Sequence, residues 1–261
     1  MFWFLPVRQR GVPLGKILLL SALLPFCLGL ATEFDRVMAK AQQGDAQAQS
    51  TLGLMYEYGE GVGQNYQQAI QWYQKAAQQN NAQAASSLGF LYYKGKAVPK
   101  DWQAAANWYR KAADQGFAEA QLNLANMYAA GEGVAQDWPS AVRWYRKAAE
   151  QGDAQAQSSL GMAYWKGQGV DRDPAASAQW YRKAAEQGWA QAQAILGVLH
   201  VTGQGVPQDR VEAYKWSHLA VQNGFGKAVG ARDKMAELLT PAQRKEAERL
   251  ARAWSENHPG R

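Results

Sequence analysis

Residues 160–185, LGMAYWKGQGVDRDPAASAQWYRKAA, contain the pattern that decides the fold. Apolar residues recur three or four positions apart on both sides of a glycine-rich interruption, Gly167-Gln168-Gly169-Val170, and this spacing is typical of one face of a helix. Glycine tolerates the left-handed backbone conformation that ends a helix. Asp173-Pro174 is typical of a helix start, because aspartate caps the first turn and proline fits its first position. The stretch therefore predicts two helices joined by a short turn.

The same pattern recurs with a period of 36 residues and without insertions. A repeat of this length indicates a solenoid, in which each helix pair stacks on the next. The second helix carries a Trp-Tyr pair at Trp72-Tyr73, Trp108-Tyr109, Trp144-Tyr145 and Trp180-Tyr181, and Trp216 continues the series. The first helix carries Leu52-Gly53, Leu88-Gly89, Leu160-Gly161 and Leu196-Gly197, with Leu124-Ala125 as a variant. A tyrosine follows each of these leucines by four positions, except that His200 replaces it in the fifth repeat.

The helix ends follow the same period. The second helix of each repeat is predicted to start after an N-cap residue, namely Asn65, Asp101, Asp137, Asp173 or Asp209. It is predicted to end at Gly44, Asn80, Gly116, Gly152, Gly188 or Gly224, where a left-handed residue fits. Leu52, Tyr56, Trp72 and Tyr73, with their equivalents, are expected to fill the space around the small Gly53 and Ala69.

The repeat frame divides the chain into five parts. We predict a signal peptide at 1–31, a lone helix of the second type at 32–44, five repeats at 45–224, a degenerate sixth repeat with a capping helix at 225–256, and a frayed tail at 257–261. Thr240-Pro241 is expected to start the capping helix, whose outer face is charged, as the end of a stack requires.

These strings, Leu-Gly-x-x-Tyr, Gly-x-Gly-Val, Asp-x-x-x-Ala and Trp-Tyr-x-Lys-Ala-Ala, resemble those of the Sel-1-like repeat family, which is related to the tetratricopeptide repeats. The resemblance covers residues 32–258. It implies an all-α, right-handed α/α superhelix that serves as a scaffold for protein–protein interaction.

The first thirty residues indicate export. Arg8, Arg10 and Lys16 precede an apolar run, Ile17 to Leu30, which is shorter than the roughly 20 residues needed to span a bilayer. Gly29-Leu30-Ala31 matches a signal-peptidase site, so we predict cleavage after Ala31 and a periplasmic or secreted protein. An uncleaved segment would be the chain's one membrane anchor. The single cysteine, Cys27, lies in this segment, so no disulfide is expected in the mature chain.

The sequence favours a non-catalytic protein. We expect no catalytic residue, cofactor or metal, because the three histidines are isolated and no motif with ligand or nucleophile spacing is present. Some relatives of this family have been linked to β-lactamase activity, but the Ser-x-x-Lys arrangement of such hydrolases is absent, so this reading ranks last. The net charge is +6, of which the first thirty residues carry half, too little to indicate nucleic-acid binding.

A partner is expected in the concave groove, which the first helices of tetratricopeptide-like repeats line. The positions turned away from the packed face differ from repeat to repeat, as a surface that reads a protein or peptide partner would. The predicted partner-binding residues are Leu54, Tyr58, Phe90, Tyr93, Lys94, Leu122, Asn126, Met162, Trp165 and Lys166. Tyr93 and Trp165, each followed by a lysine, suit a peptide with acidic groups. Alternatively, the same two rings would stack on a peptidoglycan or other cell-wall glycan fragment.

Overall fold

The computed structural model describes residues 31–258, and all the regular elements in this range are helices. The predicted all-α repeat architecture is confirmed. In chain order the elements are α1 (Glu33–Gln42), α2 (Ala46–Tyr58), α3 (Tyr66–Gln78), α4 (Ala82–Lys94), α5 (Trp102–Asp114), α6 (Ala118–Ala130), α7 (Trp138–Glu150), α8 (Ala154–Lys166), α9 (Pro174–Glu186), α10 (Ala190–Thr202), α11 (Arg210–Gln222), the 3-10 helix η1 (Gly226–Ala228), α12 (Val229–Leu238) and α13 (Pro241–Asn257).

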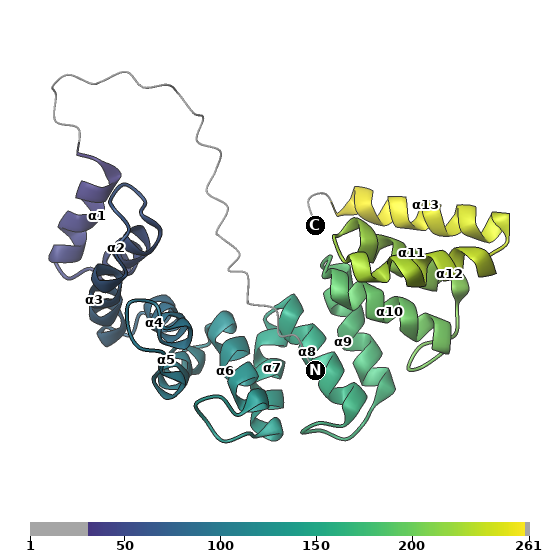
Figure 1. Ribbon diagram of the computed structural model, residues 1–261, viewed down its shortest axis with the longest axis horizontal. Helices are drawn as coiled ribbons and strands as arrows, with labels where there is room; N and C mark the ends of the chain where they lie inside the picture. The colour runs from purple at the N-terminus through teal and green to yellow at the C-terminus, as the bar shows by residue number, and fades with distance from the viewer. Residues whose placement is uncertain (1–30, 259–261) are drawn as a thin grey trace, which may run out of the picture.

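The helices stack in chain order into an open arc, with α1 at one end and α13 at the other (Figure 1). Each helix packs mainly against the helices before and after it, and α13 folds back onto α11. The helix axes turn along the stack, so that α4 and α5 are seen end-on while α13 lies across the view (Figure 1). Within residues 31–258, none of the helices has the length and apolarity that crossing a membrane requires.

Local sequence accounts for the uniform helix lengths, because caps and glycines fix both ends. All five predicted N-caps of the second helices are confirmed; for example, the Asp137 carboxylate accepts a hydrogen bond from the backbone N–H of Ser140 at 3.1 Å. The predicted left-handed residues after these helices also have positive φ, including the non-glycine Asn80 at 63°.

One glycine in the turn between the two helices of a repeat touches the repeat before it. Gly133 has a φ of +69°, and a Cβ atom there would lie 2.1 Å from the carbonyl oxygen of Trp102 at the start of α5. The turn of one repeat therefore packs directly on backbone at the start of the preceding second helix.

The core lies between the helices of each repeat. Leu52, Leu88, Leu124, Leu160 and Leu196 are completely buried, and so is Tyr73. A Cβ atom at Gly53 would lie 2.5 Å from the Tyr73 ring, which explains why a glycine is needed opposite this tyrosine. Both residues of the Trp-Tyr pair were expected to be buried, but only the tyrosine is. Tyr145 is 3% exposed, whereas its neighbour Trp144 is half-buried and carries the Lys147 ammonium 4.2 Å from its ring centre.

A buried glutamine near the start of four of the five first helices joins consecutive repeats, whereas α4 has Ala85 at this position. The Gln121 amide donates to the carbonyl of Ala113 in the preceding second helix at 3.1 Å. Its oxygen accepts from the Gln151 amide of the next second helix at 2.8 Å. Gln49, Gln157 and Gln193 repeat both contacts. Because buried polar groups are costly when unpaired, this ladder fixes the spacing of the helices as well as joining them.

Both ends of the stack are closed by helices. At the N-terminal end, α1 contacts Gln49 through the Ala41 carbonyl as a second-type helix would. At the other end, Thr240 caps α13 in a capping box with Gln243, and α13 lays Trp254 against Trp216 with ring centres 6.3 Å apart. Of the tail expected at 257–261, Asn257 belongs to α13 and His258 stacks on Trp254 at 4.4 Å, while 259–261 lie outside the described residues. The predicted signal peptide falls almost entirely in 1–30, outside the described residues.

Candidate partner-binding surface

The first helices of the repeats, α2, α4 and α6, approach one another on one side of the stack. Helices α2 and α4 touch directly, although α3 lies between them in sequence. Glu119 at the start of α6 is close enough to Glu57 and Tyr58 at the end of α2 for its charge to act on both. Residues two repeats apart meet in this way on the inner side of a curved stack. We call the surface formed by Tyr58, Phe90, Tyr93, Lys94 and Glu119 the inner face.

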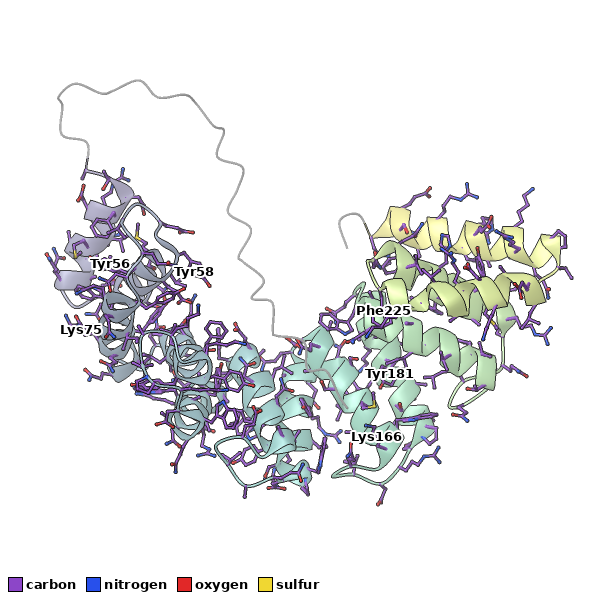
Figure 2. The ribbon with its side chains drawn as sticks, viewed as in Figure 1. Tyr56, Tyr58, Lys75, Lys166, Tyr181 and Phe225 are labelled. Atoms are coloured by element: carbon purple, nitrogen blue, oxygen red, sulfur yellow. The ribbon has the colours of Figure 1, made fainter. Side chains whose placement is uncertain are left out.

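Tyr58 is the most exposed aromatic residue of the inner face, with 51% of its surface open to solvent. It lies on the side of α2 turned toward the inside of the arc, opposite Tyr56 (Figure 2). Partial burial, followed by the charges of Glu57, Glu119 and Glu60, raises the pKa of the Tyr58 phenol to about 12. Its hydroxyl is therefore a neutral donor and acceptor among carboxylates.

Two carboxylates at this face are held away from water: Glu119 is half-buried, and Glu57 is buried next to Tyr58. The Tyr73 hydroxyl donates to Glu57 at 2.7 Å, and Glu57 is 4% exposed. Burial raises the pKa of Glu57, and the hydrogen bond from Tyr73 opposes this only in part. Burial also raises the pKa of Glu119, and the charges of Asp153 and Glu57 add to the effect. These groups can accept hydrogen bonds or pair with a cation that excludes water.

Tyr93 is engaged by its own chain and is half-buried. Its hydroxyl donates to Glu132 in the next repeat at 2.9 Å, and its ring lies 6.5 Å from that of Trp102. Burial, followed by the Glu132 carboxylate, raises the pKa of Tyr93 to about 12. The Lys94 ammonium lies 5.5 Å from the Tyr93 ring and 5.8 Å from the Phe90 ring. A cation–π contact of this kind favours an ordered lysine over a freely mobile one.

The structure does not bring all the predicted groove residues together. Leu54 and Phe90 are half-buried against the core of the first repeats, and Met162 and Trp165 against that of the last. Leu122 is 2% exposed, so the expectation that it faces a partner is wrong; the equivalent Ser50 and Ser86 are buried as well.

Asn126, between the two groups, accepts a hydrogen bond from Tyr145 at 2.7 Å and therefore serves packing within its repeat.

The two ends of the predicted groove face different directions. Tyr58 and Lys166 occupy the same position of the frame, yet they lie far apart and on different sides of the arc (Figure 2). The Trp165 ring carries the Arg172 guanidinium 5.4 Å from its centre. Since charged side chains cover the rings of both Tyr93 and Trp165, the geometry does not favour stacking of a sugar on them. The inner face of the first three repeats is thus the better candidate.

The repeat pattern did not predict Glu57 and Glu119 as functional residues, although both depart from the residue types of the other repeats. Each is a single departure from its frame position: Glu57 stands where other repeats have Tyr93, Ala129, Trp165 and Val201, and Glu119 where they have glutamine. Their proximity depends on the curvature, which the repeat pattern does not encode.

Residues 31–258 contain no group of histidine, cysteine and acidic side chains arranged to hold a metal ion. His200 is 4% exposed and takes the place of a tyrosine in the packing, with Nδ1 3.2 Å from the Pro207 carbonyl oxygen.

The comparisons with known proteins agree with this architecture. The sequence profile of the Sel1 repeat matches five consecutive segments, 46–81, 82–117, 118–153, 154–189 and 190–225. A Sel1 repeat protein from Oxalobacter formigenes is similar in structure, with a TM-score of 0.70 and 34% identity over 84% of this chain and 87% of that one.

A protective antigen of uropathogenic Escherichia coli, c5321, has a TM-score of 0.56 and 33% identity. The match covers 86% of this chain but 56% of that longer protein. A putative Sel1 repeat protein from Klebsiella pneumoniae, 22% identical over 78% of this chain and 99% of its own length, shares the fold with a TM-score of 0.50. No curated protein matches the chain.

Proposed function

This chain belongs to the Sel1 repeat family, whose members generally serve as protein-interaction scaffolds, and we propose that it is a non-catalytic adaptor of the cell envelope that holds a protein partner on its inner face. The observation that carries the proposal is the contrast between a constant frame and a variable inner face. The frame residues repeat every 36 positions, while Tyr58, Phe90, Tyr93 and Glu119 are specific to their repeats. Partly exposed aromatic side chains are typical anchors of a protein interface.

Charge indicates the chemistry of the partner. Lys94, Lys96 and Lys100 lie over aromatic rings of the chain itself, at 5.5, 5.5 and 4.3 Å from Tyr93, Tyr66 and Trp102. The carboxylates of Glu57, Glu60 and Glu119 instead surround the exposed Tyr58. This arrangement favours a basic segment with an apolar anchor, in place of the acidic peptide that the sequence suggested.

Export is part of the proposal. The predicted cleavage after Ala31 would leave Thr32 as the first residue, and Thr32 is the N-cap of α1. Removal of the preceding segment would therefore leave every described helix intact. Intact mass of the protein from the envelope fraction tests this point: a mature chain starting at Thr32 is expected, and retention of the first 31 residues would contradict it.

Site-specific photocrosslinking tests the binding surface. A photoreactive phenylalanine derivative at position 58 is expected to crosslink a single partner in cells. The same residue at position 107, exposed on α5, is the control and is expected to capture none. Equal crosslinking from both positions, or none from position 58, would contradict the inner-face assignment.

Charge reversal then tests the chemistry with purified components. Glu60→Lys is expected to weaken the complex with the crosslinked partner at least about tenfold at low salt, because it places a cation beside Tyr58. Glu150→Lys, at an exposed position of α7, changes the net charge by the same amount and is expected to leave the affinity unchanged.

A further inference from the structure

The fifth repeat breaks a contact that the third and fourth repeats share. In those repeats an arginine of the second helix donates to a tyrosine hydroxyl of the next first helix: Arg110 to Tyr128 and Arg146 to Tyr164, both at 2.7 Å. The equivalent arginine, Arg182, faces His200 in place of a tyrosine. Within residues 31–258, no hydrogen bond or ion pair reaches the Arg182 side chain, which is exposed where Arg110 and Arg146 are half-buried.

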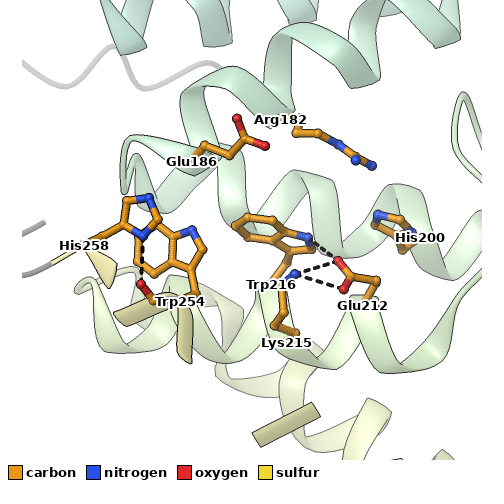
Figure 3. Close-up of a pocket in the computed structure, with 8 residues that line it drawn as sticks. All are labelled: Arg182, Glu186, His200, Glu212, Lys215, Trp216, Trp254 and His258. Atoms are coloured by element: carbon orange, nitrogen blue, oxygen red, sulfur yellow. Dashed lines mark hydrogen bonds and ion pairs between the residues drawn. The ribbon is translucent and has the colours of Figure 1, made fainter. Parts of the chain in front are cut away.

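A pocket of about 490 Å³ lies at this departure, where α9, α10, α11 and the end of α13 meet (Figure 3). Its lining residues are Arg182, Glu186, His200, Glu212, Lys215, Trp216, Trp254 and His258. A volume of this order is typical of sites for small molecules. The pocket is separate from the inner face, because it uses none of its residues.

Two buried polar atoms of the residues that line the pocket lack a hydrogen-bond partner, the Trp254 indole nitrogen and Nε2 of His200. His200 is 96% buried, since 4% of its surface is exposed. Its Nδ1 atom faces the carbonyl oxygen of Pro207 at 3.2 Å, and because a carbonyl can only accept, Nδ1 carries the proton. Burial lowers the pKa of His200, so the ring is neutral at pH 7 and Nε2 is an acceptor. Among the described residues, Nε2 has no hydrogen-bond partner. A ligand that donates a hydrogen bond would satisfy it.

The aromatic side chains of the pocket contact one another, Trp216 is 4% exposed with the Lys215 ammonium 4.4 Å from its ring centre, and the charges of Lys215 and Glu212 are already paired. Trp216 and Trp254 pack edge to face, and His258 stacks on Trp254. Glu212 accepts from the Trp216 indole at 2.9 Å and from Lys215 at 2.8 Å.

The two charges left for a ligand both come from α9. They are Arg182 and Glu186, one helical turn apart. The Arg182 guanidinium lies on the His200 side of the pocket and Glu186 on the Trp254 side (Figure 3).

We propose that this pocket binds a small aromatic α-amino or α-hydroxy acid. The carboxylate pairs with the Arg182 guanidinium, whose planar fork suits it. The adjacent ammonium or hydroxyl group donates to His200 Nε2, and the aromatic side chain lies against the half-buried Trp254.

Other small ligands fit the pocket less well. A phosphate dianion would meet the carboxylates of Glu186 and Glu212 with a single unpaired cation to bind it. A neutral sugar would carry no carboxylate to pair with the Arg182 guanidinium.

Calorimetry with the mature chain tests the ligand chemistry. L-phenylalanine and L-phenyllactate both carry the carboxylate and the neighbouring donor, and comparison of the two distinguishes the amino acid from the hydroxy acid. At least one is expected to bind with a dissociation constant below about 1 mM. Phenylpropionate, which lacks the donor, and phenethylamine, which lacks the carboxylate, are each expected to bind at least about tenfold more weakly, because each leaves one buried or charged group unpaired. The indole N–H signal of Trp254 is expected to shift with the bound fraction.

Variants make the test specific to this pocket. His200→Tyr restores the arginine–tyrosine contact of the other repeats, so it is expected to abolish binding while the melting temperature is unchanged or higher. Arg182→Gln is expected to weaken binding at least about tenfold. Arg146→Gln, at the equivalent position of the preceding repeat, is the control and is expected to bind normally.

Lack of saturable binding by both acids up to about 10 mM would overturn the proposal. So would full binding by His200→Tyr, or tighter binding of phosphate or N-acetylglucosamine than of either acid.

Discussion

Glu57 is a carboxylate placed where ionisation is costly. Its pKa is raised by burial from 4.5, so the unfolded chain ionises first as the pH rises. Stability contributed by the protonated form is therefore present at low pH and is lost as the pH rises from about 4.5 through the higher folded-state pKa. A neutral residue of the same shape avoids this loss.

We predict that Glu57→Gln removes much of this pH dependence. Relative to the wild type, the free energy of unfolding of the variant is expected to increase between about pH 4 and about pH 7. Tyr73→Phe, which removes the hydrogen bond that favours the charged carboxylate, is expected to make the loss steeper. Denaturant unfolding at several pH values measures both, and parallel curves for wild type and Glu57→Gln would contradict the assignment.

The adjacent aromatics Trp144 and Tyr145 should contribute unequally to stability. Tyr145→Ala is expected to cost about 3–5 kcal/mol, because it empties a buried site and leaves Asn126 without its donor. Trp144→Ala is expected to cost less, since this ring is half-buried. Thermal unfolding of the two variants compares them directly. An equal or larger loss for Trp144→Ala would mean that Trp144, and not Tyr145, fills the core of this repeat.

At the residue scale, the sequence predicted which positions help to pack the repeat better than how deeply each side chain is buried. Both members of the Trp-Tyr pair have the spacing of a buried stripe, but adjacent residues on a helix are about 100° apart, so one of them must turn toward the edge. Leu122 was placed on the groove because its frame position is turned away from the packed face of the first helix, but this position is in fact buried at Ser50, Ser86 and Leu122. The pocket beside His200 includes residues of α13, which is distant in sequence.

At the scale of the element, the helix boundaries follow from capping chemistry that acts over three or four residues, so they were predictable. The glycines in the turns between the two helices of a repeat were less predictable than the caps, because some of them also contact the preceding repeat. Gly61 and Gly133 occupy the same turn position with φ of 71° and 69°. A Cβ at Gly61 would meet only ordinary contacts, at 3.5 Å from Met55 and 3.6 Å from Phe34.

We predict that Gly133→Ala is more destabilising than Gly61→Ala. Both substitutions force alanine into the left-handed region, which costs about 1–2 kcal/mol. The alanine at position 133 must in addition displace the turn from the Trp102 backbone. Ala97 already occupies this position in the second repeat with φ of 59°, so the left-handed cost alone is tolerable. Equal losses in denaturant unfolding would show that the turn shifts without cost.

For the whole molecule, the stack should tolerate the loss of one repeat. Deletion of residues 82–117 removes α4 and α5 and lets α6 take the place of α4 against α3. The product is expected to remain helical by circular dichroism but to melt at a lower temperature, since one interface between neighbouring repeats is lost. Loss of helical signal would show that the repeats are not interchangeable.

The same deletion separates the two proposed sites. It removes Phe90, Tyr93 and Lys94 from the inner face, so partner binding is expected to fail. The pocket at α9–α13 is untouched, so its ligand is expected to bind as before.

The stack of helix pairs was predictable from the period, but the composition of the candidate surfaces was not. A small rotation between successive repeats, repeated along the arc, places Tyr58 and Lys166 on different sides although their frame position is the same. Such a rotation comes from the detailed fit of side chains between helices. The folding back of α13, which completes the pocket, likewise has no periodic signal.

Because almost every contact within residues 31–258 joins helices that are near neighbours in the chain, none of the described elements fastens one end of the arc to the other. A load applied across the termini would thus be borne in series, one interface after another. Each repeat that yields would release about 120 Å of extended chain, and its refolding would need only the adjacent repeat as a template. The molecule would behave as a recoverable molecular spring, able to stay attached at both ends while the distance between its anchors changes.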